Sequence, residues 1–201
     1  MSKNGSQSTS ALRRTARTLV VLGLAACAAC TSLTPTERPT TRDTAGLEER
    51  ARAAANDGNF STAADLYTQL AMASTGSARI DYLLEAARLA TDYGDTALAR
   101  RRLGEARNGA SVAQQQRSSV LLARVELAEG RPQAALDMLA ALPQALPQQT
   151  QRDAAAVRGQ ALFRIGRPVE AVRVLVEREV WLEDADSIVA NQRMIWDGFR
   201  A

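Results

Sequence analysis

Cys27 and Cys30 are the two cysteines of the chain, and they lie three positions apart. A C-x-x-C pair can be a redox dithiol, half of a metal site or a disulfide. A redox pair is expected beside a strand–helix–strand pattern, and a zinc site needs more ligands than two thiolates. Neither is present, and the chain contains no histidine. The role of the pair therefore has to be inferred from its flanking residues.

Residues suited to catalysis are scarce in the rest of the chain. Without histidine, the commonest general base and metal ligand is missing. Acids lie close together at Glu48 and Glu49, and again at Asp184 and Asp186. Such acids are typical of solvated helix ends and helix starts. The glycines form no phosphate-binding loop. We expect no enzymatic activity, cofactor or metal site in these 201 residues.

The residues before Cys27 have the pattern of a secretory signal peptide. Residues 1–18 contain no acid and four basic residues, Lys3, Arg13, Arg14 and Arg17. The short apolar run TLVVLGLAA follows. A basic start, an apolar centre and small residues at the exit are typical of a signal that is removed. The run is shorter than the roughly 18 residues of a membrane-spanning helix. We therefore predict that 1–26 is a signal peptide outside the fold.

The exit Leu24-Ala25-Ala26-Cys27 resembles a bacterial lipobox. The resemblance implies that the Cys27 thiol receives a diacylglyceryl group and becomes an acylated amino terminus. Cys30 is the alternative site, although it would place Cys27 where an aliphatic residue is preferred. Each buried methylene contributes about 0.8 kcal/mol, so several acyl chains form a stable anchor. By the same resemblance, Ala28 after the acylated cysteine implies the outer membrane.

Removal of the signal changes the charge of the chain. The sequence has 25 basic and 22 acidic residues, so loss of four basic residues leaves 21 and 22, a net charge of −1. This balance gives no electrostatic case for nucleic-acid binding. Residues 27–45 contain six threonines and two prolines, and we predict that they form an extended tether.

Four glycines divide the remaining chain at equal intervals of 36 residues: Gly58, Gly94, Gly130 and Gly166. Five residues after each glycine lies an alanine: Ala63, Ala99, Ala135 and Ala171. Nine residues after each lies a large apolar residue: Tyr67, Leu103, Leu139 and Leu175. Seven residues before each the side chain is small: Ala51, Ala87, Ala123 and Gly159. Glycine suits a left-handed helix end, and Pro132 and Pro168 suit the start of the next helix. Each unit is therefore expected to be a pair of helices.

This pattern resembles the tetratricopeptide repeat, whose usual period is about 34 residues. The chain is rich in alanine, leucine and arginine and lacks strand-like runs, which also favours an all-α fold. We predict a tetratricopeptide-like helical-hairpin solenoid of about four degenerate 36-residue repeats over residues 46–180, with a terminal helix in 181–201. The alternative is an ordinary helical bundle. We expect helices near residues 46–56, 60–74, 78–93, 95–107, 112–129, 133–142, 150–165, 168–179 and 185–199.

In the tetratricopeptide register, the residue six positions before each loop glycine faces the concave groove. The residues at these positions are Arg52, Arg88, Arg124 and Gln160. Three guanidinium groups in line could bind an acidic peptide or a carboxylate. The alternative is a solvated helix face. Our hypothesis is that these side chains contribute to partner binding.

The C-terminal stretch IVANQRMIWDGF adds a more specific resemblance. Together with the lipobox-like exit and the helical repeats, it resembles the amino-terminal region of the penicillin-binding protein activator lipoproteins, the LpoA or LppC family. The sharpest match consists of Asn191, Gln192, Arg193, Ile195 and Trp196. In that family, a similar run lies where the helical domain meets the next domain. The run also fits a capping helix in which Trp196 covers the last apolar face.

The resemblance implies an outer-membrane lipoprotein facing the periplasm. Its partner would be a class A penicillin-binding protein, a bifunctional peptidoglycan synthase whose peptide cross-linking it stimulates. The effect would be allosteric, because the contact would favour an active enzyme conformation. Family members continue into a second α/β domain. This chain is therefore expected to be the amino-terminal part of such a protein. We also expect a monomer, because solenoids of this type are often monomeric.

Two other functions fit the same sequence. Scaffold lipoproteins for pilus secretin assembly or outer-membrane protein insertion also combine a lipobox with tetratricopeptide repeats. Such scaffolds would lack the second α/β domain. The remaining alternative is a lipid-anchored enzyme whose catalytic domain lies beyond Ala201.

Overall fold

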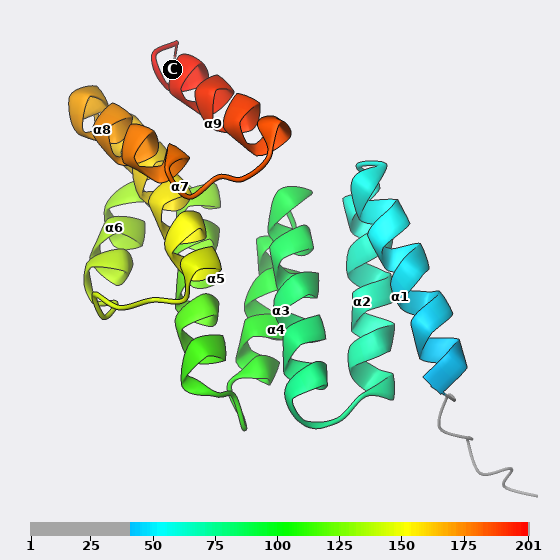
Figure 1. Cartoon of the computed structure of the whole chain (residues 1–201). Helices are drawn as coiled ribbons and strands as arrows, with labels where there is room; N and C mark the ends of the chain where they lie inside the picture. Colours follow the sequence, from blue (N-terminus) through cyan, green and yellow to red (C-terminus); the bar gives the residue numbers. More distant parts are fainter. Residues whose placement is uncertain (1–40, 201) are drawn as a thin grey trace, which may run out of the picture. The chain divides into compact units, whose positions relative to one another are not determined.

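The computed structural model describes residues 41–200, which form nine α-helices and no strand (Figure 1). The all-α prediction is therefore confirmed for this part of the chain. The helices are α1 (Thr41–Asn56), α2 (Phe60–Ala73), α3 (Gly76–Asp92), α4 (Thr96–Ala106), α5 (Val112–Ala128), α6 (Pro132–Ala140), α7 (Gln148–Arg164), α8 (Pro168–Glu179) and α9 (Ala185–Gly198).

The largest difference from the expected helix boundaries lies at the start of α1. This helix begins at Thr41, so residues 41–45 of the predicted tether are helical. No proline or glycine occurs between Pro39 and Gly46, and nothing in that stretch opposes a helix. The predicted signal peptide, Cys27 and Cys30 lie outside the described residues. None of the described helices has the length and apolar character needed to cross a membrane.

Tight turns at the four regularly spaced glycines join helices in pairs. Gly58, Gly94, Gly130 and Gly166 have φ angles of 77°, 95°, 76° and 76°, a left-handed conformation that favours glycine. At each turn, the N–H of the residue after the glycine donates to the carbonyl five positions earlier, as from Arg131 to Glu126 at 2.9 Å. This bond satisfies a carbonyl at the helix end. The second helix of each pair begins two residues after the glycine.

The helix pairs follow one another along the chain, as Figure 1 shows. The pairs are α1 with α2, α3 with α4, α5 with α6 and α7 with α8. The first helices of successive pairs also make contact, α3 with α5 and α5 with α7. The last helix, α9, packs on both α7 and α8. Residues 36 positions apart on the first helices are thereby brought to neighbouring places.

Small residues lie where the two helices of a pair approach each other. The four alanines that follow the glycines are all fully buried: Ala63, Ala99, Ala135 and Ala171. The large apolar residues of the repeat pattern are buried as well: Tyr67, Leu103, Leu139 and Leu175. In the last pair, a Cβ on Gly159 would lie 2.6 Å from Leu175 Cγ. Only a residue without a side chain fits at this position.

Between α1 and α7, buried apolar residues form three successive clusters. One joins α1, α2 and α3 around Leu70 and Leu89. The next reaches from α2 through α3 and α4 to α5, and the third joins α5, α6 and α7 around Leu139 and Val157. Each cluster includes residues from more than one pair. The pairs therefore bury their apolar faces by stacking on their neighbours.

Candidate partner-binding site

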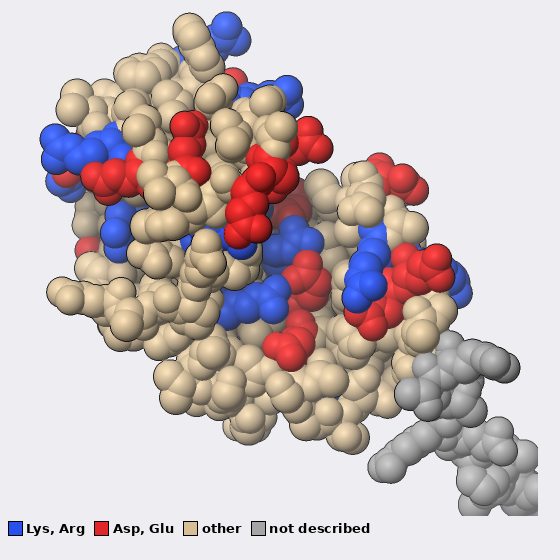
Figure 2. All heavy atoms as spheres, viewed as in Figure 1, with Lys and Arg blue, Asp and Glu red and all other residues tan. Residues whose placement is uncertain are grey.

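Two of the predicted groove residues, Arg88 on α3 and Arg124 on α5, meet at the carboxylate of Asp92. Arg88 Nη1 lies 2.9 Å from Asp92 Oδ2, and Arg124 Nη2 donates to Oδ1 of the same carboxylate. Arg88 Nη2 also lies 2.6 Å from Glu85 Oε1, and Glu85 accepts from Arg117 of α5 at 2.6 Å. We call these five residues the α3–α5 charge ladder. On the face seen in Figure 2, basic and acidic side chains lie next to each other.

A buried glutamine extends the same junction toward the start of α5. The Gln114 amide Nε2 donates to Asp81 Oδ1 at 2.8 Å and to Ser77 Oγ at 2.9 Å, both on α3. The Gln114 side chain also closes a capping box with Ser111 at the start of α5. Polar contacts therefore join α3 to α5 along most of their shared length.

The pairing alters the proton affinities within the α3–α5 charge ladder. Burial acts to raise the pKa of Glu85, but Arg88 and Arg117 outweigh it, and the pKa is lowered. For Asp92 burial dominates, and its pKa is raised despite Arg124 and Arg88. Burial acts to lower the pKa of Arg88, but Glu85 and then Asp92 reverse the effect and raise it. All three groups are held as members of ion pairs.

Arg88 and Arg124 thus lie in paired charges rather than in a row of free guanidinium groups. Glu85 and Asp92 are the residues that the groove register alone does not reveal. They lie three positions before and four positions after Arg88. At these spacings opposite charges pair on a helix surface, so the signal was present in the sequence. Binding of an acidic partner by these arginines stays a prediction.

The other two predicted groove residues lie apart from the ladder. Arg52 pairs with Glu48 on its own helix, α1. Gln160 on α7 instead faces α9, where its Nε2 lies 3.4 Å from Met194 Sδ. The four residues of the predicted row therefore do not form one continuous site.

A pocket of about 420 Å³ lies between α7 and α9. Its lining includes Gln160 and Arg193, which the sequence analysis predicted in two different roles, together with Arg164, Phe163 and Asp197. Neither Arg164 nor Arg193 forms an ion pair within residues 41–200. Cations free to meet a partner therefore lie at this end of the array, beside the run that resembles the activator family.

Asn191, the first residue of that run, is fully buried and fixes α9 in place. Its Nδ2 donates to the Leu175 carbonyl at 2.8 Å and to Glu179 Oε1 at 3.1 Å, both on α8. Its Oδ1 accepts from Arg178 Nη1 at 2.7 Å. A buried amide with all these partners positions one helix on another.

The expectation that Trp196 covers the last apolar face is wrong, because its side chain is 69% exposed. Trp196 lies five residues after Asn191, about 140° around the helix from the packed face. On that face Gly198 lies against the ring of Phe163, whose centroid is 5.6 Å from that of Phe199. Gln192 and Arg193 are exposed, and Ile195 is partly buried.

No group of three or more histidine, cysteine, aspartate or glutamate residues that could hold a metal ion occurs within residues 41–200. The lipidation prediction for Cys27, with Cys30 as alternative, falls on residues that lie outside this range.

Comparison of the chain with protein-family models, with curated proteins and with solved structures finds no match. The resemblance carried by Asn191–Trp196 therefore stays a prediction, and the function has to be argued from the site.

Proposed function

We propose that the chain is the partner-binding part of an outer-membrane lipoprotein that activates a class A penicillin-binding protein. The observation that carries the proposal is the exposed face of α9. The run that resembles the activator family includes Arg193, which lines the α7–α9 pocket, and Trp196, which is 69% exposed on α9. Tryptophan and arginine are the side chains that most often dominate protein interfaces. Catalysis would belong to the partner, whose active conformation the contact would favour.

The proposal includes a tetratricopeptide-like architecture for residues 46–180, with about four degenerate repeats. It is supported by the equal spacing of four glycines with positive φ and by the contacts between successive pairs. A stacked array supplies an extended contact surface and needs no catalytic group.

We also propose that residues 1–26 are a signal peptide and that Cys27, or alternatively Cys30, carries the lipid. The support is the lipobox-like exit and the basic, apolar order of the preceding residues. The intact mass of the protein purified from washed outer membranes tests this proposal. An amino terminus at Cys27 with acyl chains is expected, and an unacylated product would contradict it.

The α9 contact can be tested with Trp196→Ala and Arg193→Gln. We expect each variant to weaken binding to a purified class A penicillin-binding protein about ten-fold, because truncation at an interface centre commonly costs more than 1 kcal/mol. The matched controls are Met72→Ala, an apolar side chain that is 73% exposed on α2, and Arg101→Gln on α4. Biolayer interferometry gives the affinities, and the rate of peptide cross-linking gives the activation.

Two outcomes would count against the proposal: one concerns the location of the contact, and the other concerns the activator function itself. Unchanged affinity in the Trp196→Ala, Arg193→Gln double variant would place the contact elsewhere on the chain. No binding by the unmodified chain to any class A penicillin-binding protein would remove the activator function and favour the assembly-scaffold alternative.

A further inference from the structure

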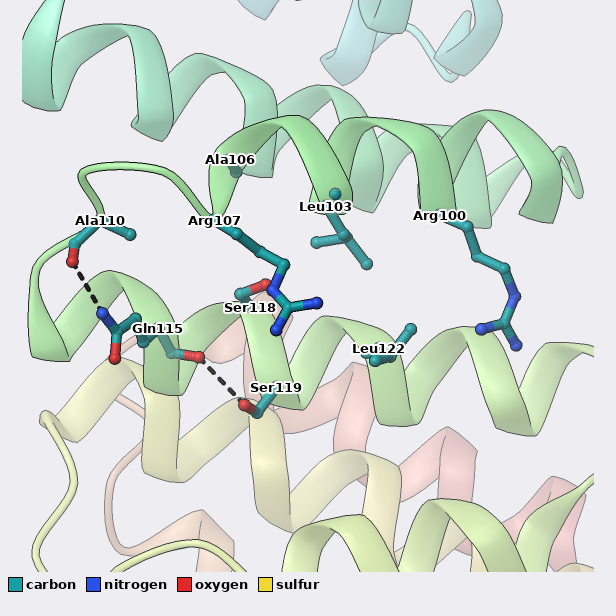
Figure 3. A pocket seen from close by; sticks show the side chains of 10 residues that line it. Arg100, Leu103, Ala106, Arg107, Ala110, Gln115, Ser118, Ser119 and Leu122 are labelled. Carbon is teal, nitrogen blue, oxygen red and sulfur yellow. Dashed lines mark hydrogen bonds between the residues drawn. The ribbon is translucent and has the colours of Figure 1, made fainter.

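A second pocket, of about 620 Å³, lies between α4 and α5. No residue of α9 or of the α3–α5 charge ladder lines it. In Figure 3, Arg100 on α4 and Arg107 directly after α4 extend toward α5 on either side of Leu103, and Leu122 lies on α5 between them. The pocket thus has the apolar side chains of Leu103 and Leu122 between two guanidinium groups. Its volume is in the range of small-ligand sites.

The Arg100 guanidinium is already neutralised. Arg100 Nη2 lies 2.6 Å from Glu126 Oε1 and 2.6 Å from Glu129 Oε2. These two carboxylates also pair with Arg131. Two guanidinium groups and two carboxylates balance in this network, so it offers no uncompensated positive charge to an anionic ligand.

The Arg107 guanidinium is free among the residues that the structure describes. Arg107 follows directly after α4, and its side chain makes no ion pair or hydrogen bond within the described part of the chain. The Ser118 hydroxyl is likewise without a partner there. Gln115 donates from Nε2 to the Ala110 carbonyl at 2.9 Å, which leaves its Oε1 available to accept. One unpaired cation, one hydroxyl and one amide oxygen therefore line the pocket together with the two leucines.

We propose that this pocket binds the free carboxylate at the end of a short apolar peptide. The planar Arg107 guanidinium suits a single carboxylate. Leu103, Ala106 and Leu122 accept a small aliphatic side chain. The Ser118 hydroxyl and Gln115 Oε1 provide partners for the main-chain groups of the peptide. This site is independent of the α9 contact and of the partner proposed there.

The test is a titration of the full chain with N-acetyl-Ala-Ala and with its carboxyl-terminal amide, followed by amide chemical shifts in NMR spectra. We expect the acid to shift resonances of residues 103–122 in a saturable way. The amide should bind about ten-fold more weakly, the size of one hydrogen-bonded charge. Arg107→Gln should cause a similar loss for the acid, and Ser118→Ala a smaller one. Arg101→Gln, an exposed arginine on α4 outside the pocket, should leave the affinity unchanged.

The proposal is overturned if the acid causes no saturable shifts, if the acid and the amide bind equally, or if Arg101→Gln weakens binding as much as Arg107→Gln. Because no penicillin-binding protein is present in the titration, these outcomes leave the proposed function untouched.

Discussion

At the scale of single residues, Asn191 shows how one buried amide holds a helix. In Asn191→Ala, the Leu175 carbonyl and the partly buried Arg178 guanidinium each lose a partner. An unsatisfied buried group costs about 1–3 kcal/mol, so the free energy of unfolding should fall by about that amount. Urea denaturation measures the change. The exposed neighbour Gln192 provides the control, since Gln192→Ala should stay within about 0.5 kcal/mol. Equal losses in the two variants would show that α9 is not held by Asn191.

For two helical glycines, Gly159 and Gly104, we expect replacement by alanine to change the stability in opposite directions. Gly159→Ala would place a Cβ 2.6 Å from Cγ of the fully buried Leu175, and overpacking of this kind costs about 1–3 kcal/mol. Gly104 on α4 has no atom within 4 Å of the same position. Gly104→Ala should therefore stabilise the helix by up to about 1 kcal/mol.

Thermal unfolding of both glycine variants checks this prediction. Adding Leu175→Ala to Gly159→Ala should remove the clash with the new Cβ. The stability lost through the cavity that Leu175→Ala leaves should not be recovered. The two changes together should therefore cost less than the sum of their separate effects. Destabilisation by Gly104→Ala would contradict the account.

At the scale of elements, Arg100 ties α4 to the end of α5. Hydrogen bonds from Arg100 lower the pKa of Glu129 from 4.5 to about 2, although burial opposes the shift. The pKa of Glu126 is lowered as well, chiefly by Arg131 and then by Arg100. A carboxylate with a depressed folded pKa stabilises the fold above its unfolded pKa. That contribution is lost as the pH falls through the folded pKa.

Arg100→Gln should therefore make the fold less sensitive to acid between about pH 4.5 and pH 2. The variant is expected to be less stable than the unmodified chain at pH 7, with the difference shrinking toward pH 2. Urea midpoints measured across this range give the slope. Arg101→Gln is the control, because Arg101 makes no ion pair among the described residues. Parallel slopes for Arg100→Gln and the unmodified chain would refute the assignment.

The elements were also the most predictable part of the molecule. The glycines and Pro132 and Pro168 are local signals, since they restrict the backbone at their own positions, and they marked the helix turns to within a few residues. The start of α1 was missed because a stretch rich in threonine carries no local helix signal. Contacts such as Arg124 with Asp92, which lie 32 residues apart in sequence, depend on how pairs stack. The repeat register placed Arg88 and Arg124 near each other but did not show that the acids of α3 would pair with them.

At the scale of the whole molecule, the candidate binding groups Arg107, Arg193 and Trp196 lie outside the repeated positions of the helix pairs. Trp196 and Arg193 are on α9, and Arg107 lies in the connection between two pairs. The 36-residue pattern therefore does not predict these three residues. The α4–α5 pocket could not be predicted from the sequence for this reason. Paired charges dominate the repeated positions, whereas the candidate binding groups lie at irregular ones.

The prolines that open α6 and α8 have a further consequence for limited proteolysis. Arg131 and Arg167 lie in the turns before these helices, and each is followed directly by proline. Proteases specific for arginine cleave an Arg–Pro bond poorly, because the rigid ring replaces the amide N–H. Among the arginines in the connections between the described helices, Arg107 is the one that is not followed by proline. Brief tryptic digestion of the folded protein should therefore nick the array first after Arg107, between α4 and α5, and Arg107→Gln should abolish that early cut.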